Sequence, residues 1–247
     1  MSTLKAAYLN ELYKISKKKV IIFASIFSIL VVIIAGIIVY SVNNFIGIRI
    51  TGCSEFSILV LSVLSYTLIP LFTAFVCIEM FSGEFVEQTI KITLTSPAPR
   101  LKVFTAKILA IATFIATNLI FVMLISFATS LFLNSTSLSI FKIMLAYISQ
   151  FLPILVFALV VITIANLTKG TTSTFMLSVL VFLVFNGLGF AFPYFKSILF
   201  TSAFDWYRLF LGSYINIFKI LRTFLILCGY GIMFFGIGFY LFDKKEV

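Results

Sequence analysis

The chain has 247 residues, of which 62% are hydrophobic and only 11% are charged, and its mean hydropathy is +1.21. A water-soluble domain of this length, which on average carries roughly a quarter charged residues, cannot bury so much apolar surface. The net charge of +10 is spread around apolar stretches, so it indicates membrane topology and no nucleic-acid partner is expected.

An amphipathic helix is predicted within residues 1–19. Its apolar side chains recur at helical spacing, at Leu4, Tyr8, Leu12 and Ile15. We expect Lys5, Glu11 and Lys14 to face away from that stripe. Three lysines at 17–19 then mark the water boundary, so the helix is expected to lie on the membrane surface.

Six apolar stretches follow, each long enough to cross a bilayer, which takes about 20 residues. They cover 20–42, 56–78, 106–133, 142–167, 172–195 and 220–242. The sequence therefore predicts an all-α membrane protein, with residues 1–247 forming a single transmembrane domain.

Orientation follows from lysines and arginines in the short loops, which favour the cytoplasmic side. With the N-terminus inside, twelve of the 18 basic residues are cytoplasmic and six are external. Both termini are therefore expected in the cytoplasm, and the chain is expected in a bacterial cell membrane.

Two connections are longer than a tight turn requires. The segment 79–105 is predicted to be cytoplasmic and carries Glu79, Glu84 and Glu87. The segment 196–219 is predicted to be external and to form short helices at the outer interface, where aromatic rings settle. Its aromatic residues are Phe204, Trp206, Tyr207, Phe210 and Tyr214.

Several kinds of chemistry have no residues to support them. The deep parts of the predicted spans contain no Asp, Glu, Lys, Arg or His, which argues against a proton-driven carrier. The chain has no histidine, its three cysteines lie far apart, and it has no G-x-x-x-x-G-K-S/T loop, so neither a metal site nor a nucleotide site is expected. If ATP drives this protein, ATP and Mg²⁺ must be bound by another chain.

One charged segment remains. Glu84, Glu87 and Lys91 lie three and four residues apart, so on a helix they share one face and can pair. Pro97 and Pro99 then end the element. The segment is either an ordinary solvated loop or an exposed docking element.

This segment resembles the membrane subunits of ABC type-2 permeases, in which it reads approximately E-x-E-x-G-T-I/L-K-x-L-L-x-x-P-V/I-x-R with a basic residue further on. The matching positions are Glu84, Thr89, Ile90, Lys91, Leu94, Pro97, Arg100 and Lys107. The sequence departs from the pattern at Val86 and Gln88, where the family has an acidic residue and a glycine.

The resemblance implies that residues 79–102 form a coupling helix seated on a separate ATP-binding subunit. It also implies two copies of the ATPase and a second permease copy, expected to be identical. On this hypothesis Glu84→Lys or Glu87→Lys uncouples transport from ATP hydrolysis and leaves the fold intact.

The sequence offers only a few candidate residues for a transport path or for close helix packing. The candidates are Asn118, Gln150 and Asn186 in the spans, and two stripes in the last span, Gly229 with Gly236 and Gly231 with Gly238. The apolar walls favour a hydrophobic or amphipathic cargo, with a membrane-active peptide as the first hypothesis. Alternatives are a lipid or drug efflux permease, a non-transporting scaffold or immunity protein, and an ion-coupled carrier.

Overall fold

The computed structural model describes residues 3–45, 56–87, 99–133, 139–168, 170–192, 198–212 and 216–244. Every regular element within these ranges is a helix. In chain order they are α1 (Thr3–Lys17), α2 (Lys19–Phe45), α3 (Phe56–Tyr66), α4 (Leu68–Ile78), the π-helix η1 (Glu79–Gly83), α5 (Glu84–Val86), α7 (Arg100–Phe132), α8 (Ile140–Leu167), α9 (Thr171–Ala191), the 3₁₀-helix η2 (Phe200–Asp205), α11 (Arg208–Leu211) and α12 (Ile217–Lys244).

Six helical stretches in the described part of the chain are long and apolar enough to cross a membrane. They are Ile21–Asn44, Leu68–Val86, Arg100–Phe132, Ile140–Leu167, Thr171–Ala191 and Ile217–Lys244. The chain is therefore an all-α multi-pass membrane protein, and the prediction of six spans is confirmed.

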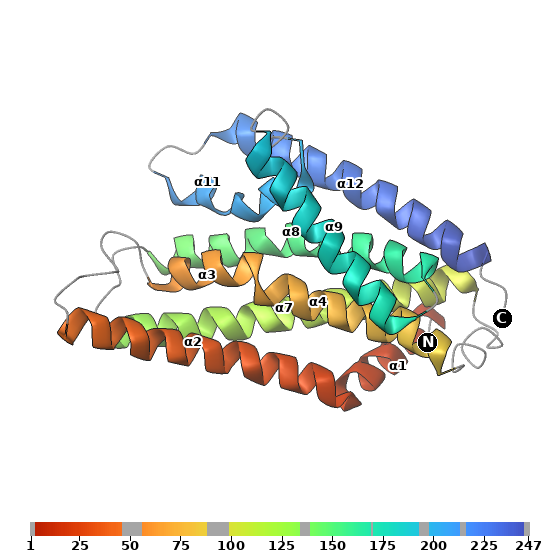
Figure 1. Cartoon of the computed structure of the whole chain (residues 1–247), viewed down its shortest axis with the longest axis horizontal. Coiled ribbons are helices and arrows are strands. Elements are labelled where there is room, and N and C mark those ends of the chain that lie inside the picture. The colour runs from red at the N-terminus through yellow and green to blue at the C-terminus, as the bar shows by residue number, and fades with distance from the viewer. Residues whose placement is uncertain are drawn as a thin grey trace.

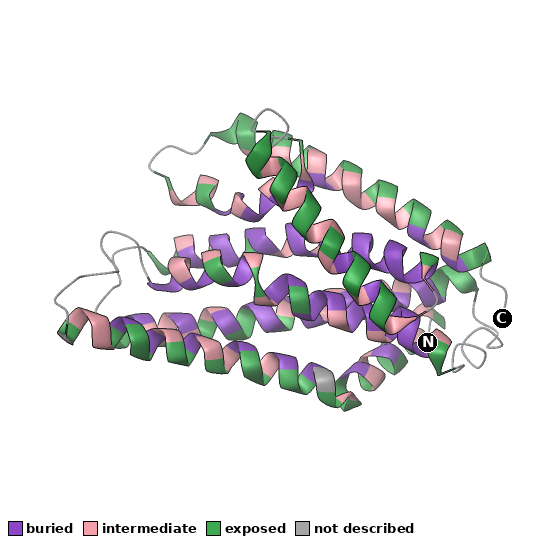
Figure 2. Cartoon of the chain, viewed as in Figure 1, coloured by how far each residue is buried: buried purple, intermediate pink, exposed green. Residues whose placement is uncertain are grey.

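The bundle is organised around α8, which packs against α4, α7, α9 and α12. Most of the α8 span is buried, whereas α9 and α12 are mostly exposed, and Figure 2 shows this difference as purple and green ribbon. Long apolar side chains on α2, α9 and α12 therefore face outward, as expected of surfaces solvated by lipid. In Figure 1, α1 and the end of α12 lie at one end of the bundle, which we call the terminal end. The opposite end is called the far end.

The second span differs from its predicted form because its helix is interrupted at Thr67. Pro70 lacks the N–H that would bond to the carbonyl of Tyr66, and its ring would collide with that carbonyl. A proline fits without loss in the first turn of a helix. The chain breaks at Thr67 and α4 begins at Leu68, which places Pro70 in the first turn of α4. The hydroxyl of Thr67 donates to the carbonyl of Val63 at 2.8 Å, which satisfies one group at the break.

The connection between the second and third spans is shorter than predicted. Helical structure continues through η1 and α5 to Val86, and α7 begins at Arg100 rather than at residue 106. The predicted end of the second span at residue 78 is therefore wrong: Glu79 and Glu84, which were predicted to lie in a separate coupling segment, continue the helix of the second span. Residues 88–98 lie outside the described part of the chain.

The segment before the last span does contain short helices, η2 and α11, as predicted. Its aromatic side chains do not lie at the membrane interface as predicted. Phe204 and Tyr207 are fully buried, and Trp206 is nearly so. Phe204 packs against Tyr66 and Phe182, so η2 fills a gap between helices rather than lying at the headgroups. Phe210 is half-buried, and Tyr214 lies outside the described residues.

The two glycine stripes of α12 have different surroundings. A Cβ placed at Gly238 would lie 3.4 Å from Cζ of Phe104 and 3.4 Å from Oγ1 of Thr163, so this stripe packs against α7 and α8. A Cβ at Gly229 or Gly236 would meet nothing within 4 Å. Packing within the protomer therefore explains one stripe and not the other.

We expect Gly238→Leu to destabilise the bundle and Gly236→Leu to be near neutral. The larger side chain at position 238 must displace Phe104 and Thr163, and overpacking of this kind costs about 1–3 kcal/mol. The check is the thermal unfolding midpoint of the two variants purified in the same detergent. Equal midpoints would contradict the assignment of the two faces.

Candidate functional site

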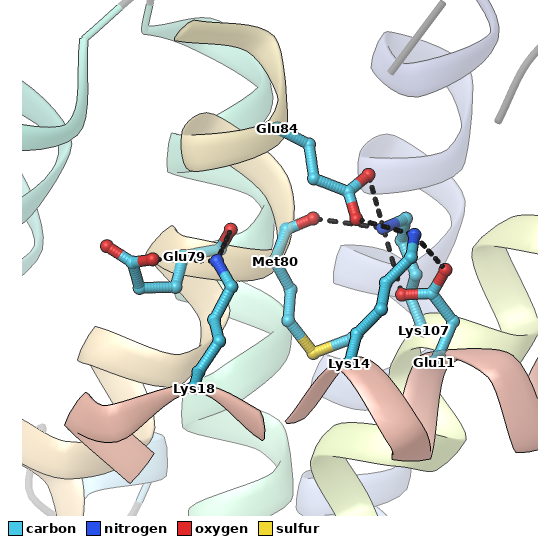
Figure 3. Close-up of polar contacts among 7 residues, drawn as sticks. All are labelled: Glu11, Lys14, Lys18, Glu79, Met80, Glu84 and Lys107. Carbon is cyan, nitrogen blue, oxygen red and sulfur yellow. Dashed lines mark hydrogen bonds and ion pairs between the residues drawn. The ribbon is translucent and has the colours of Figure 1, made fainter. Parts of the chain in front are cut away.

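A buried lysine lies at the centre of a charged cluster at the terminal end. Lys107 projects from the second turn of α7 and has no exposed side-chain surface. Its Nζ lies 2.7 Å from Oε2 of Glu84, 3.2 Å from Oε2 of Glu11 and 3.1 Å from the carbonyl oxygen of Met80 (Figure 3). Glu11 and the Met80 carbonyl accept hydrogen bonds from the ammonium, and Glu84 adds an ion pair whose geometry is not that of a hydrogen bond.

Helix α1 supplies the next charges. Nζ of Lys14 lies 2.9 Å from Oε1 of Glu11 and 3.1 Å from Oε1 of Glu84. Nζ of Lys18, just after α1, lies 2.7 Å from Oε2 of Glu79. Three lysines and three glutamates therefore balance one another. They come from α1 and the residue after it, from η1 and α5 at the end of the second span, and from α7 (Figure 3).

The glutamates are held in place by an unusual stretch of helix. Glu79 begins η1, and Glu84 follows it directly in α5. A π-helical turn is rare and often occurs at functional sites, because it shifts the register of side chains and backbone carbonyls. Here the carbonyl of Met80, within η1, accepts a hydrogen bond from Lys107. Ser82 is also anchored, donating to the carbonyl of Ala165 in α8 at 3.2 Å.

The side chain of Lys14 on α1 is stabilised in its charged form. Burial lowers the pKa of Lys14, but the attraction of Glu84 and the hydrogen bond to Glu11 outweigh it, so the pKa lies above its ordinary value. A raised lysine pKa stabilises the folded state at neutral pH, and this contribution is lost only as the pH rises through the raised value. The contribution of Lys14 to the contact between α1 and the bundle is therefore retained across the physiological pH range.

Two predicted orientations on α1 are wrong. Glu11 is 3% exposed and Lys14 contacts Glu84, so neither faces away from the apolar stripe. Glu11 falls on the same helical face as Tyr8 and Ile15, and α7 presents Lys107 opposite that face. A helix lying free on the membrane would not bury a carboxylate, whereas a helix docked against a lysine does so with compensation. Lys5 is exposed, as predicted.

The predicted coupling residues fall into three groups. Glu84 and Lys107 are buried and paired with each other, so the expectation that Glu84 is exposed is wrong. Glu87 and Arg100 are exposed. Thr89, Lys91 and Pro97 lie outside the described residues, and so does the predicted pairing of Lys91 with the glutamates.

Further contacts tie the two chain ends to α7. The guanidinium of Arg100 pairs with the carboxylate of Asp243 near the end of α12, at 3.7 Å. The ammonium of Lys102 donates to Oγ1 of Thr3 at 2.8 Å. Both pairs are exposed and contribute at most about 1 kcal/mol each. They place α1, α7 and α12 together where the 88–98 segment joins the bundle.

The predicted path residues are dispersed. Asn118 and Gln150 are buried in α7 and α8, and neither side-chain nitrogen nor oxygen of Gln150 has a hydrogen-bond partner among the described residues. Asn186 is half-buried and donates to the carbonyl of Phe182 at 2.9 Å. Gly229 and Gly236 are exposed. The structure does not bring these residues into one site.

Sequence reasoning missed four members of the charged cluster, Glu11, Lys14, Lys18 and Glu79. One signal was available, because Glu11 interrupts the apolar stripe of α1 at helical spacing from Tyr8 and Ile15. A carboxylate in an apolar stripe predicts a buried cation opposite it. Its partner, Lys107, is 96 residues away in the sequence.

The six spans define a polytopic membrane protein, and the charged cluster lies at the terminal end of its bundle. The family model described as ABC-2 family transporter protein matches residues 8–189, a range that contains the whole cluster. The chain belongs to the ABC-2 family of transporter proteins. Permeases of this family are the membrane subunits of transporters that work with an ATPase subunit. No curated protein matches the chain.

Proposed function

We propose that this chain is the membrane subunit of an ATP-driven exporter, and that a separate ATP-binding chain docks at the terminal end. The charged cluster carries the proposal. It lies where the 88–98 segment leaves and re-enters the bundle, so a force on that segment reaches the second and third spans directly.

The ion pairs make this end of the bundle suitable for transmitting motion. Lys107 joins α7 to Glu84 of the second span and to Glu11 of α1. A displacement of one element therefore moves the other two, whereas independent helices would absorb it. We therefore expect α1 to move together with the second and third spans when the 88–98 segment is displaced.

The proposed orientation puts the terminal end in the cytoplasm of a bacterial cell. Both chain ends then face the ATPase subunits, and the excess of basic residues lies on the inner side. Two copies of this permease and two ATPases form the proposed transporter. ATP and Mg²⁺ are bound by the ATPase chains, and this chain contributes no catalytic residue.

The proposed cargo is hydrophobic or amphipathic, and a membrane-active peptide is the first candidate. Support comes from an apolar cavity of about 460 Å³ between α7 and α8, lined among others by Met123, Tyr147 and Phe151. Lipids and apolar drugs are the alternatives within the same class. A path for an inorganic ion or sugar would need more polar groups than these helices offer.

The experiment is cargo-stimulated ATP hydrolysis by the permease co-purified with its ATP-binding chain and reconstituted in liposomes. Membrane-active peptides, short-chain phospholipids and cationic drugs are compared at matched concentrations. Stimulation and vesicle accumulation with peptides alone support the first candidate. Stimulation only by the other compounds transfers the assignment to lipid or drug export, and no response to any of them contradicts an amphipathic cargo.

A further inference from the structure

A cavity of about 530 Å³ lies between the first two helices and α7. It is found where α1 and α2 meet at an angle, near the terminal end of the bundle (Figure 1). Ser16 of α1, Ile22 and Ile26 of α2, and Thr113 and Thr117 of α7 are among the residues that line it. Three helices therefore enclose one apolar space with a few hydroxyl groups in its wall.

The cavity faces the hydrocarbon of the bilayer. Ile22, Ile26 and Ile29 line it and belong to the first span, which begins at Ile21. Ile22 and Ile26 are about half exposed. At 1.5 Å per residue, the stretch from Ile22 to Ile29 is roughly 10 Å deep, which lies within one leaflet, whose hydrocarbon is about 15 Å thick. Water is absent at this depth, so acyl chains cover such a surface.

The hydroxyl groups of the wall need no polar ligand. Ser16, Ser25, Thr113 and Thr117 each donate to a backbone carbonyl three or four residues earlier in the chain, at 2.7 to 3.2 Å. Since these donors are satisfied within the helices, a polar solute gains little by entering. The interior of the cavity therefore suits an acyl chain better than a polar solute.

Two exposed lysines stand at the rim of the cavity. Lys19 precedes Ile22 and Ile26 by three and seven residues, so it lies on the same face of α2, one turn nearer the terminal end. Lys17 directly follows Ser16 at the end of α1. Both lysines are exposed. The rim is therefore basic at the level where the first span leaves the membrane.

The positive charge at the rim is not balanced within the described chain. Lys18 pairs with Glu79 at 2.7 Å, whereas neither Lys17 nor Lys19 forms an ion pair with a described residue. Nζ of Lys17 lies 5.5 Å from the centre of the Tyr13 ring, which attracts the cation without neutralising it. Basic residues at the end of a span attract anionic headgroups. We propose that the cavity holds an acyl chain of an anionic phospholipid, whose headgroup lies against Lys17 and Lys19.

Photolabelling tests the position of the lipid directly. The protein is placed in phosphatidylcholine nanodiscs that contain a low fraction of phosphatidylglycerol with a photoreactive diazirine in its acyl chain, and labelled peptides are mapped by mass spectrometry. Phosphatidylcholine with the same chain, at the same fraction, is the matched probe. Each lysine at a membrane surface contributes about fivefold, so we expect roughly thirtyfold more labelling of 21–29 and 113–117 by the anionic lipid.

Two outcomes of this experiment would overturn the proposal. Equal labelling of these segments by the two lipids would mean that the cavity holds ordinary solvating lipid without regard to charge. No labelling by either lipid would mean that another helix covers the cavity, such as one from a second copy of the chain.

Charge variants separate a specific site from general attraction. Lys17→Gln/Lys19→Gln should reduce labelling by phosphatidylglycerol to the level of phosphatidylcholine, and both side chains are exposed, so the fold should be unchanged. Lys142→Gln/Lys219→Gln removes the same charge from the far end and should keep the preference. Equal losses in the two double variants would contradict a site at the junction of α1 and α2.

Thr117→Phe tests whether the acyl chain enters the cavity. Thr117 is exposed on α7, so the larger side chain fills the cavity without disturbing buried packing. We expect labelling of 21–29 by the anionic lipid to fall, with an unchanged unfolding midpoint in detergent. Undiminished labelling would place the chain outside the cavity and refute the proposal. None of these measurements requires the ATP-binding chain, so their outcome is independent of the proposed transport function.

Discussion

Lys107→Met should destabilise the bundle by about 3–5 kcal/mol, which is the usual cost of leaving a buried ion without its partner. Lys107 has no exposed surface, and its loss leaves Glu11 and Glu84 sharing the single cation of Lys14. Glu84→Gln should also destabilise the bundle, in this case by leaving a positive charge without its partner. Lys107 and Lys14 then share the single carboxylate of Glu11.

The double variant Glu84→Gln/Lys107→Met restores the charge balance of the cluster, since Glu11 and Lys14 still pair at 2.9 Å. We therefore expect it to be more stable than either single variant, which a double-mutant cycle measures directly. Glu87→Gln is the control, since this carboxylate is exposed three residues away. Thermal unfolding in detergent gives the four values, and strict additivity would contradict the coupling. Glu84→Lys should likewise damage the fold, contrary to the sequence-based expectation.

Glu87→Lys should reduce transport by about tenfold or more while leaving the fold intact. The side chain is exposed at the root of the 88–98 segment, so reversing its charge alters the proposed docking surface without disturbing buried contacts. A loss of about 1.4 kcal/mol in productive docking corresponds to this tenfold effect. The measurement is cargo transport in proteoliposomes alongside ATP hydrolysis by the same preparation.

The control for this variant is Lys142→Glu, a charge reversal at the far end of the bundle. It should transport normally if docking occurs at the terminal end. Wild-type transport by the Glu87 variant, with an unchanged unfolding midpoint, would refute the role given to this residue. A lowered midpoint would show instead that Glu87 acts through the fold.

The spans could be predicted because a bilayer imposes length and hydropathy on each of them independently. The break at Thr67 depends on Pro70, a local signal that hydropathy averaging hides. The extension of the second span to Val86 was not predictable from apolarity, because Glu79 and Glu84 look like loop residues until their cations are placed.

The charged cluster could be predicted only in part for a related reason. Lys107 and Glu84 were identified from their motif, but their burial depends on α1 docking across a long sequence separation. The aromatic segment before the last span was also misplaced. Aromatic residues are typical of the membrane interface, but neighbouring helices bury Phe204 and Tyr207. Tertiary packing decided both cases.

The most direct test of the central claim is photo-cross-linking from Val86, which is exposed at the end of α5. A photoreactive amino acid is placed at this position, or at Lys142 at the far end, in cells that express the whole transporter. We expect a cross-link from position 86 to a chain that carries a G-x-x-x-x-G-K-S/T loop, and none from position 142. A cross-link to that chain from position 142 alone, in cells that still export cargo, would contradict the central claim.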